Sequence, residues 1–146
     1  PCSSGSSTTC GSNTGFYVEL QRGSSLVIGL RLCTGNDSPE RDPITVSLEG
    51  SNLSGSVLSM GSSWTLVYNG TSGLQTDPGR STCGLPQLVN STIYYKSYRF
   101  LVSSKRSSEN SMQFSELQLY GYWSGHFSLY ETVYHICFCC CSSHLS

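Results

Sequence analysis

A polar loop in the first third of the sequence is the segment richest in groups that could bind a ligand. Residues 35–43 read GNDSPERDP and contain two prolines and four charges. Carboxylates, an amide and a guanidinium can together donate and accept several hydrogen bonds, as binding of sugar hydroxyls requires. An arginine between acids can equally fix the entry to a strand, and this structural role is favoured because the charges can satisfy one another. The candidate glycan-binding residues, which include two from later in the chain, are Asn36, Asp37, Glu40, Arg41, Asp42, Tyr95 and Arg106.

Eight cysteines in a chain of 146 residues are the second set of reactive side chains. So many thiols are costly to keep reduced, and they indicate disulfides formed in an oxidising compartment. The cysteines near the C-terminus, with His144, are also zinc-ligand types, but adjacent cysteines are poorly spaced for one tetrahedral site. We therefore expect disulfides, whose connectivity the spacing does not define. The candidates are Cys2, Cys10, Cys33, Cys83, Cys137, Cys139, Cys140 and Cys141.

Four N-x-S/T sequons indicate the same compartment, because glycosylation requires passage through a secretory lumen and exposure at the surface. They lie at Asn36, Asn52, Asn69 and Asn90. We expect glycans on at least two of the four, with Asn69 and Asn90 favoured and Asn36 disfavoured by the nearby Pro39. The first residues carry no signal-peptide pattern, and no apolar run approaches the length of a transmembrane helix. The sequence thus predicts a secreted glycoprotein, present as a mature or trimmed chain.

Composition and motif content argue against two other classes of function. Charged residues make up 12% of the chain and the formal net charge is -1, so no basic field attracts nucleic acid. The sequence has no G-x-S-x-G elbow, no H-E-x-x-H helix and no glycine-rich phosphate loop. All three histidines (His126, His135 and His144) lie in the last 21 residues, outside the regular strands, where a general base is hard to position. We expect neither nucleic-acid binding nor catalysis.

Alternation of apolar and polar residues over short segments predicts β-strands that position these groups. The clearest run spans residues 26–33, with its leucines and Ile28 in one phase. Similar segments lie at 16–21, 44–49, 64–68, 93–102 and 112–120. Short strands without intervening helices imply an antiparallel sandwich or barrel. The predicted core consists of Ile28, Leu30, Leu32, Val46, Leu48, Trp64, Leu66, Phe100 and Val102.

Changes in amino-acid composition divide the chain into three parts. We expect a Cys/Ser-rich loop over residues 1–12, the sandwich over 13–122, and an aromatic and Cys-rich C-terminal appendage or added strand over 123–146. The last part carries more apolar surface than a free tail normally does, so we expect it to contact a neighbouring chain or domain. Aromatic side chains that could support a sugar ring are Trp64, Tyr94, Tyr95, Tyr122 and Trp123, of which Trp64 is assigned to the core by its phase with Leu66.

Several runs together resemble galactose-binding-like domains. They are GFYVELQRGSSLVIGLRLCTGNDSPERDPITVSLEGSN, SSWTLVYNG, YRFLVSSKR and MQFSELQLYG, within approximately residues 13–121. This class contains discoidin, coagulation factor V/VIII type C domains and family 32 carbohydrate-binding modules. The resemblance implies an all-β fold, an antiparallel jelly-roll β-sandwich that binds glycans or cell surfaces through loops at one end. It also implies a structural calcium ion with Glu116 as a ligand, although CGSNTG stands where the class has an early Asp-Gly loop.

Two functions from different classes follow. The first is an extracellular glycan-binding or adhesion module, lectin-like, whose partners are glycans or glycoproteins. The alternative is a structural building block of a disulfide-linked, glycosylated extracellular coat or filament. In that case the chain would self-associate through residues 123–146 and its sheet edges.

Overall fold

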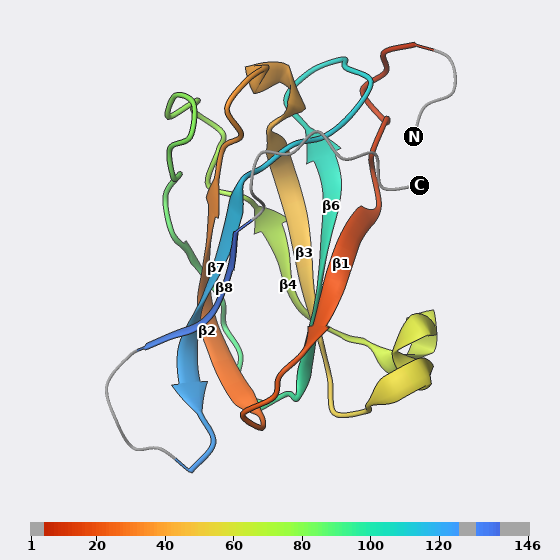
Figure 1. Cartoon of the computed structure of the whole chain (residues 1–146), viewed down its shortest axis with the longest axis vertical. Coiled ribbons are helices and arrows are strands. Elements are labelled where there is room, and N and C mark those ends of the chain that lie inside the picture. Colours follow the sequence, from red (N-terminus) through yellow and green to blue (C-terminus); the bar gives the residue numbers. More distant parts are fainter. Residues whose placement is uncertain (1–4, 126–130, 138–146) are drawn as a thin grey trace.

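Two four-stranded antiparallel sheets face each other in a β-sandwich (Figure 1). The computed structural model describes residues 5–125 and the backbone of residues 131–137. The first sheet consists of β1 (Thr14–Glu19), β6 (Ser97–Lys105), β3 (Pro43–Ser51) and β4 (Thr65–Thr71), and the second of β5 (Gln87–Leu88), β2 (Ser25–Cys33), β7 (Glu116–Trp123) and β8 (Glu131–Cys137), each in that spatial order. The predicted all-β antiparallel sandwich is confirmed, whereas its jelly-roll form stays a prediction.

The core lies between the sheets and is formed by the inward-facing residues of each long strand. In β6, Tyr98, Phe100 and Val102 are buried, while Arg99 and Leu101 between them are partly exposed. Burying one large apolar side chain contributes about 1.5–3 kcal/mol, so this alternation is the main source of stability. Six residues of the predicted core are buried as expected, namely Leu30, Leu32, Val46, Leu48, Phe100 and Val102.

The prediction is wrong for Ile28, Trp64 and Leu66, which are not fully buried, and two β-bulges account for the difference. The pairing of β2 with β7 shifts between Val27 and Gly29, so Val27 is fully buried and Ile28 only partly. The pairing of β3 with β4 shifts after Leu48, which leaves Leu66 59% exposed and Trp64 partly exposed. An extra residue in one strand moves the following side chains to the other face of the sheet.

The connecting loops gather at the two ends of the sandwich. Loops 34–42, 72–86 and 106–115 lie at the upper end in Figure 1, and the first of them contains the 3-10 turn η1 (Pro39–Arg41). The lower end carries the 3-10 turns η2 (Gly55–Ser59) and η3 (Gly61–Ser63). The strands predicted at 93–102 and 112–120 begin later, at Ser97 in β6 and Glu116 in β7, because residues 93–96 belong to the segment between β5 and β6 and residues 112–115 to loop 106–115.

The described part of the C-terminal segment belongs to the sandwich. Strand β8 pairs with β7 from Glu116 opposite Cys137 to Gly121 opposite Glu131. It is therefore an added edge strand of the sandwich, which is one of the two alternatives expected for residues 123–146, and a contact of this segment with a neighbouring chain or domain stays a prediction. Residues 126–130 and 138–146 lie outside the described residues. Within the described residues, no helix is long and apolar enough to cross a membrane.

Candidate functional site

A buried carboxylate organises the upper loop end. The Asp42 side chain is 1% exposed, and Arg80 holds it in a bidentate pair, with Nη1 donating to Oδ1 at 2.8 Å and Nη2 to Oδ2 at 2.6 Å. Arg106 Nη2 donates to the same Oδ2 at 3.3 Å. Two guanidiniums thus compensate the desolvation of one carboxylate, the arrangement that a buried charge requires.

The same two arginines are bonded to backbone and acid groups of two loops, 34–42 and 72–86. Arg106 donates to the carbonyls of Pro39 and Gln75, both at 3.1 Å. Arg80 donates to the Asp37 carbonyl at 2.9 Å and to Asp77 Oδ1 at 2.7 Å. The Gly79 N–H and the Arg80 guanidinium lower the pKa of Asp77. These charged groups already have partners, and their hydrogen bonds hold the loops together.

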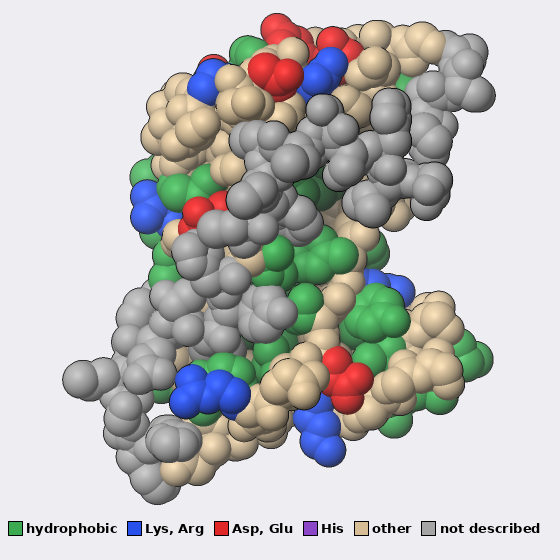
Figure 2. Space-filling model, in the orientation of Figure 1, with side chains coloured by type: hydrophobic (Ala, Val, Ile, Leu, Met, Phe, Trp, Pro, Cys, Tyr) green, Lys and Arg blue, Asp and Glu red, His purple; other side chains and the backbone are tan. Residues whose placement is uncertain are grey.

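The other predicted loop residues lie at the same end but are largely paired. Arg41 lies 3.5 Å from Asp37 and 3.7 Å from Glu109, and Asn36 Oδ1 accepts a hydrogen bond from Gln113 at 3.2 Å. Glu40 is exposed. Figure 2 shows acidic and basic side chains intermingled over this end. The structure therefore brings Asn36, Asp37, Glu40, Arg41, Asp42 and Arg106 together, but as a network that mostly satisfies itself.

Tyr95 is a wrong candidate for a surface site. It is 6% exposed, and its ring packs edge-on to Tyr98, with 5.9 Å between the ring centroids. It precedes β6 while Arg106 follows β6, so a strand of nine residues separates the two, a distance of roughly 30 Å. Its ring occupies the space where a Cβ on Gly50 would lie. Tyr95 is a core residue at the lower end.

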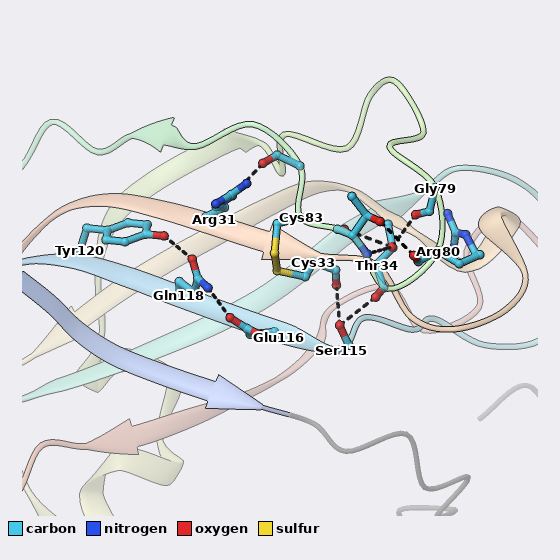
Figure 3. The surroundings of a disulfide bond; sticks show 12 residues. Arg31, Cys33, Thr34, Gly79, Arg80, Cys83, Ser115, Glu116, Gln118 and Tyr120 are labelled. Atoms are coloured by element: carbon cyan, nitrogen blue, oxygen red, sulfur yellow. Dashed lines mark hydrogen bonds between the residues drawn. A yellow bond between two sulfur atoms is a disulfide. The ribbon is translucent and has the colours of Figure 1, made fainter.

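The residues around Glu116 do not fit calcium. Its carboxylate lies within 4.8 Å of the sulfur atoms of Cys33 and Cys83, which form a disulfide (Figure 3). The Gln118 amide donates to the carboxylate. Calcium takes six to eight oxygen ligands, whereas two of the three side chains in this cluster offer sulfur atoms. Among the described residues it is the only cluster of three or more His, Cys, Asp or Glu ligands. We derive no role for calcium from it.

The disulfide joins the end of β2 to the long loop 72–86. Cys33 and Cys83 come from segments 50 residues apart, and the bond holds the loop that carries Arg80 against the second sheet. Cys10 is buried and disulfide-bonded as well. Cys2, Cys139, Cys140 and Cys141 lie outside the described residues, as does the side chain of Cys137. The predicted disulfides are thus confirmed for the three cysteines whose side chains are described.

All four sequon asparagines are exposed, but they differ in how their amides are used. Asn52 donates through Nδ2 to the Tyr94 carbonyl at 3.1 Å, and Asn36 is bonded as described above. The side-chain amides of Asn69 and Asn90 have no partner in the described part of the chain. Glycosylation stays a prediction, and these two remain the favoured positions.

The outer face of the first sheet, which points away from the core, carries a second cluster of functional side chains. The strand register places Tyr17 opposite Arg99, Arg99 opposite Glu49, and Glu49 opposite Leu66, so these four form one row. The Trp64 ring lies beside this row, with its centroid 5.7 Å from that of Tyr17 and 5.0 Å from Arg99 Cζ. We call Tyr17, Glu49, Trp64 and Arg99 the outer-face platform.

The platform combines exposed ring surface with polar groups that are not all used. Tyr17 is 48% exposed. Arg99 Nε donates to Glu49 Oε2, and the two side chains are 20% and 17% exposed. Within the described chain, the Tyr17 hydroxyl and the Arg99 nitrogens Nη1 and Nη2 have no hydrogen-bond partner. The platform can therefore accept a flat apolar surface and hydrogen-bond groups at its edge.

The two 3-10 turns at the lower end position Trp64. Leu58 in η2 is 1% exposed and anchors the turn. The Trp64 Nε1 donates to the Leu58 carbonyl at 3.0 Å, which fixes the direction of the indole. Because that is the only donor of the indole, its ring surface and not its N–H is left for a ligand. Figure 2 shows apolar side chains beside acidic and basic ones at the lower right, where Figure 1 places η2 and η3.

Sequence reasoning misses the platform because Trp64, Leu66 and Tyr68 share one phase. Tyr68 does pack against the core, but the bulge in the pairing of β4 separates it from the other two. One signal is present in the sequence. Tyr17 lies between Phe16 and Val18, which face the core, and this alternation places it on the outer face.

Comparison with solved structures finds proteins of similar fold. No protein-family model matches the chain, and no curated protein matches it. Among solved structures, the fold is similar to that of CBM62 from Clostridium thermocellum Xyl5A, with 14% sequence identity and a TM-score of 0.46. The match covers 77% of this chain and 73% of that chain.

Proposed function

We propose that this protein is an extracellular, non-catalytic module that binds glycans through the outer-face platform. The observation that carries the proposal is the exposed Tyr17 ring beside Trp64, bordered by Arg99 nitrogens without a partner in the described chain. A sugar ring has an apolar face of C–H groups and a rim of hydroxyls. The aromatic surface suits the face and the polar groups suit the rim.

The charge balance of the platform favours a neutral or weakly charged sugar. Arg99 is paired with Glu49, so the site carries no net charge from these two groups. The guanidinium keeps Nη1 and Nη2 for hydroxyl oxygens, and the Tyr17 hydroxyl can both donate and accept. Hydroxyl groups, which donate and accept alike, match this set better than a phosphate or sulfate would.

The upper loop end is a weaker site for the same ligand. Asp42, Arg80 and Arg106 are bonded to one another and to backbone carbonyls. A sugar that bound them would have to displace buried charge pairs, which costs several kcal/mol. Among the described residues, Glu40 is the one acid of the predicted loop set whose side chain is exposed and has neither a hydrogen-bond nor an ion-pair partner, and a single carboxylate is a small recognition surface.

An extracellular location is supported by the bonding state of the cysteines and by the sequons. Disulfides persist in oxidising compartments, and Cys33, Cys83 and Cys10 are all disulfide-bonded. The exposed amides of Asn69 and Asn90 are open to modification. Weak single-site binding is expected, with useful avidity reached by repetition of the module.

A glycan array probed with dilute monomeric protein that carries no N-linked glycans tests the proposal. We expect the wild type to bind at least one class of glycan and Tyr17→Ala to bind it about tenfold more weakly, because loss of one ring contact removes about 1.4 kcal/mol. Tyr94→Ala is the matched control, since Tyr94 is 38% exposed and lies outside the platform row. An array without any bound glycan, or equal losses in both variants, would contradict the proposal.

The scaffold function keeps one observation in its favour. Leu85, Leu88 and Ile93 are 74%, 82% and 52% exposed along and beside β5, the edge strand of the second sheet. An apolar edge invites strand addition from another chain. Multimers that dissociate with reductant on a gel, together with a blank glycan array, would favour this second function.

A further inference from the structure

The sequon at Asn69 lies on the same outer face as the platform. Asn69 is an exposed residue of β4 and pairs with Ser47 of β3, whereas Leu66 pairs with Glu49. Ser47 and Glu49 both belong to the outward-facing phase of β3. Asn69 and Leu66 are therefore outer-face neighbours along β4, on either side of the bulge.

The distances place a glycan on Asn69 within reach of the whole platform. Asn69 is the diagonal neighbour of Glu49, and diagonal pairs lie about 7–8 Å apart. The first sheet from β4 to β1 spans three strand spacings, or roughly 14 Å. An oligosaccharide of several rings is longer than this width, so it can extend from Asn69 to Tyr17.

The surface between these points suits a sugar. The row that contains Asn69 continues through Ser47 to the partly exposed Leu101 on β6, two strands away. The 59% exposed Leu66 is the outer-face neighbour of Asn69 along β4. An apolar side chain beside the asparagine can pack against the apolar face of the first sugar ring. The side-chain amide of Asn69 has no partner in the described chain, so attachment breaks no hydrogen bond there.

We propose that Asn69 carries an N-linked glycan that lies over the outer-face platform and controls its access to external glycans. In the transfer, Asn69 Nδ2 forms a bond to C1 of the first sugar of a polyprenyl-pyrophosphate-linked oligosaccharide. The bond between that C1 and the pyrophosphate oxygen breaks, and the polyprenyl pyrophosphate and the amide proton leave. The modified amide is uncharged, as the free amide is.

Tethering gives the attached glycan an advantage over any free ligand. A group on a short flexible linker is present at its site at an effective concentration on the order of millimolar. Weakly binding external glycans below that concentration are excluded from the platform. Chains that lack the Asn69 glycan are then the ones that bind external glycans. This inference rests on the proposed function, because it assigns regulation to the same platform.

The test uses the full chain secreted from eukaryotic cells, as wild type, Asn69→Gln and Asn90→Gln. Asn90 is the matched control because it is also exposed but follows β5 in the second sheet. Peptide mass analysis reports occupancy of each sequon. Hydroxyl-radical labelling of Tyr17 reports its exposure without any external ligand. Binding to a glycan array completes the comparison.

We expect Asn69 to be occupied, and Tyr17 to be labelled severalfold faster in Asn69→Gln than in the wild type or in Asn90→Gln. Array binding should rise in Asn69→Gln alone. An unoccupied Asn69, or equal labelling of Tyr17 in all three proteins, would overturn the inference. If Tyr17 is shielded as expected but no variant binds any array glycan, the glycan covers the platform and it is the proposed function that fails.

Discussion

Asp42 illustrates how a residue that offers hydrogen bonds to a ligand can instead serve the fold. Its side chain is 1% exposed, and both carboxylate oxygens accept hydrogen bonds from arginines of distant loops. A charge in this position is tolerated only because its partners are in place. The most strongly bonded acid of the predicted site is thus a structural residue.

Replacement of Asp42 should therefore destabilise the protein. We expect Asp42→Asn to lower the free energy of unfolding by about 3 kcal/mol, because Arg80 and Arg106 lose their shared counter-charge. Asp37→Asn is the control, because Asp37 is 55% exposed in its pair with Arg41, and such a pair contributes at most about 1 kcal/mol. Urea unfolding measures both, and similar small losses would show that the network does not support the loops.

The buried Tyr98 hydroxyl makes the free energy of unfolding depend on pH in the alkaline range. Its hydroxyl donates to the Ser25 carbonyl at 2.6 Å, and burial raises the pKa of Tyr98 from 10.0 to about 12. Because the pKa is higher in the folded state, this contribution to stability is full below pH 10.0 and is lost as the pH rises from 10.0 to about 12.

Tyr98→Phe should make the protein less sensitive to alkaline pH. At neutral pH we expect it to lower the free energy of unfolding by about 1 kcal/mol, since the hydrogen bond from the Tyr98 hydroxyl is lost and the Ser25 carbonyl keeps only the Tyr95 N–H as a donor. Above pH 10.0 the difference from the wild type should shrink. Urea unfolding at several pH values measures this, and an identical pH dependence in both proteins would mean that Tyr98 does not titrate as described.

At the scale of strands, the sequence predicts well which side chains of a strand face the core, but it does not predict the positions of β-bulges. Alternation in β3 and β6 is a local property of the chain, so Leu48 and Phe100 are assigned to the core from sequence. A bulge depends on the partner strand, which lies far away in sequence. The phase of β2 therefore holds for Leu30 but fails for Ile28.

The same limit applies to the candidate site. The loop acids and Arg106 are visible as a polar group, but Arg80 lies 38 residues from Asp42, and no local pattern selects it. Trp64 is visible as an aromatic residue, yet its place on the outer face depends on the pairing of β4 with β3. Contacts between distant segments thus decide which polar groups are paired within the protein and which remain available to a ligand.

The bulge in β2 can be tested by a pair of substitutions. Val27 is fully buried and Ile28 only partly, so we expect Val27→Ala to cost about 2 kcal/mol of unfolding free energy and Ile28→Ala about 1 kcal/mol. The larger side chain thus gives the smaller loss. Chemical denaturation of both variants decides the order, and the reverse order would indicate a regular strand without the bulge.

At the scale of the whole molecule, the stabilising network and the proposed binding surface lie in different places. The upper loop end is held by a network of charges, and the disulfide between Cys33 and Cys83 ties one of its loops to the second sheet. Strand β8 extends that sheet at its far edge. The outer face of the first sheet instead carries exposed rings and available polar groups. This arrangement supports binding on a sheet face rather than at the loop end.

Dissociation constants for one array-identified glycan, measured side by side for three proteins that carry no N-linked glycans, test this claim most directly. Tyr17→Ala removes a platform ring, and Glu40→Gln removes a loop-end charge while keeping its size. The account predicts binding about tenfold weaker for Tyr17→Ala than for the wild type, a change of about 1.4 kcal/mol, with Glu40→Gln unchanged. Loss of binding in Glu40→Gln with wild-type affinity in Tyr17→Ala would contradict it and place the ligand at the loop end.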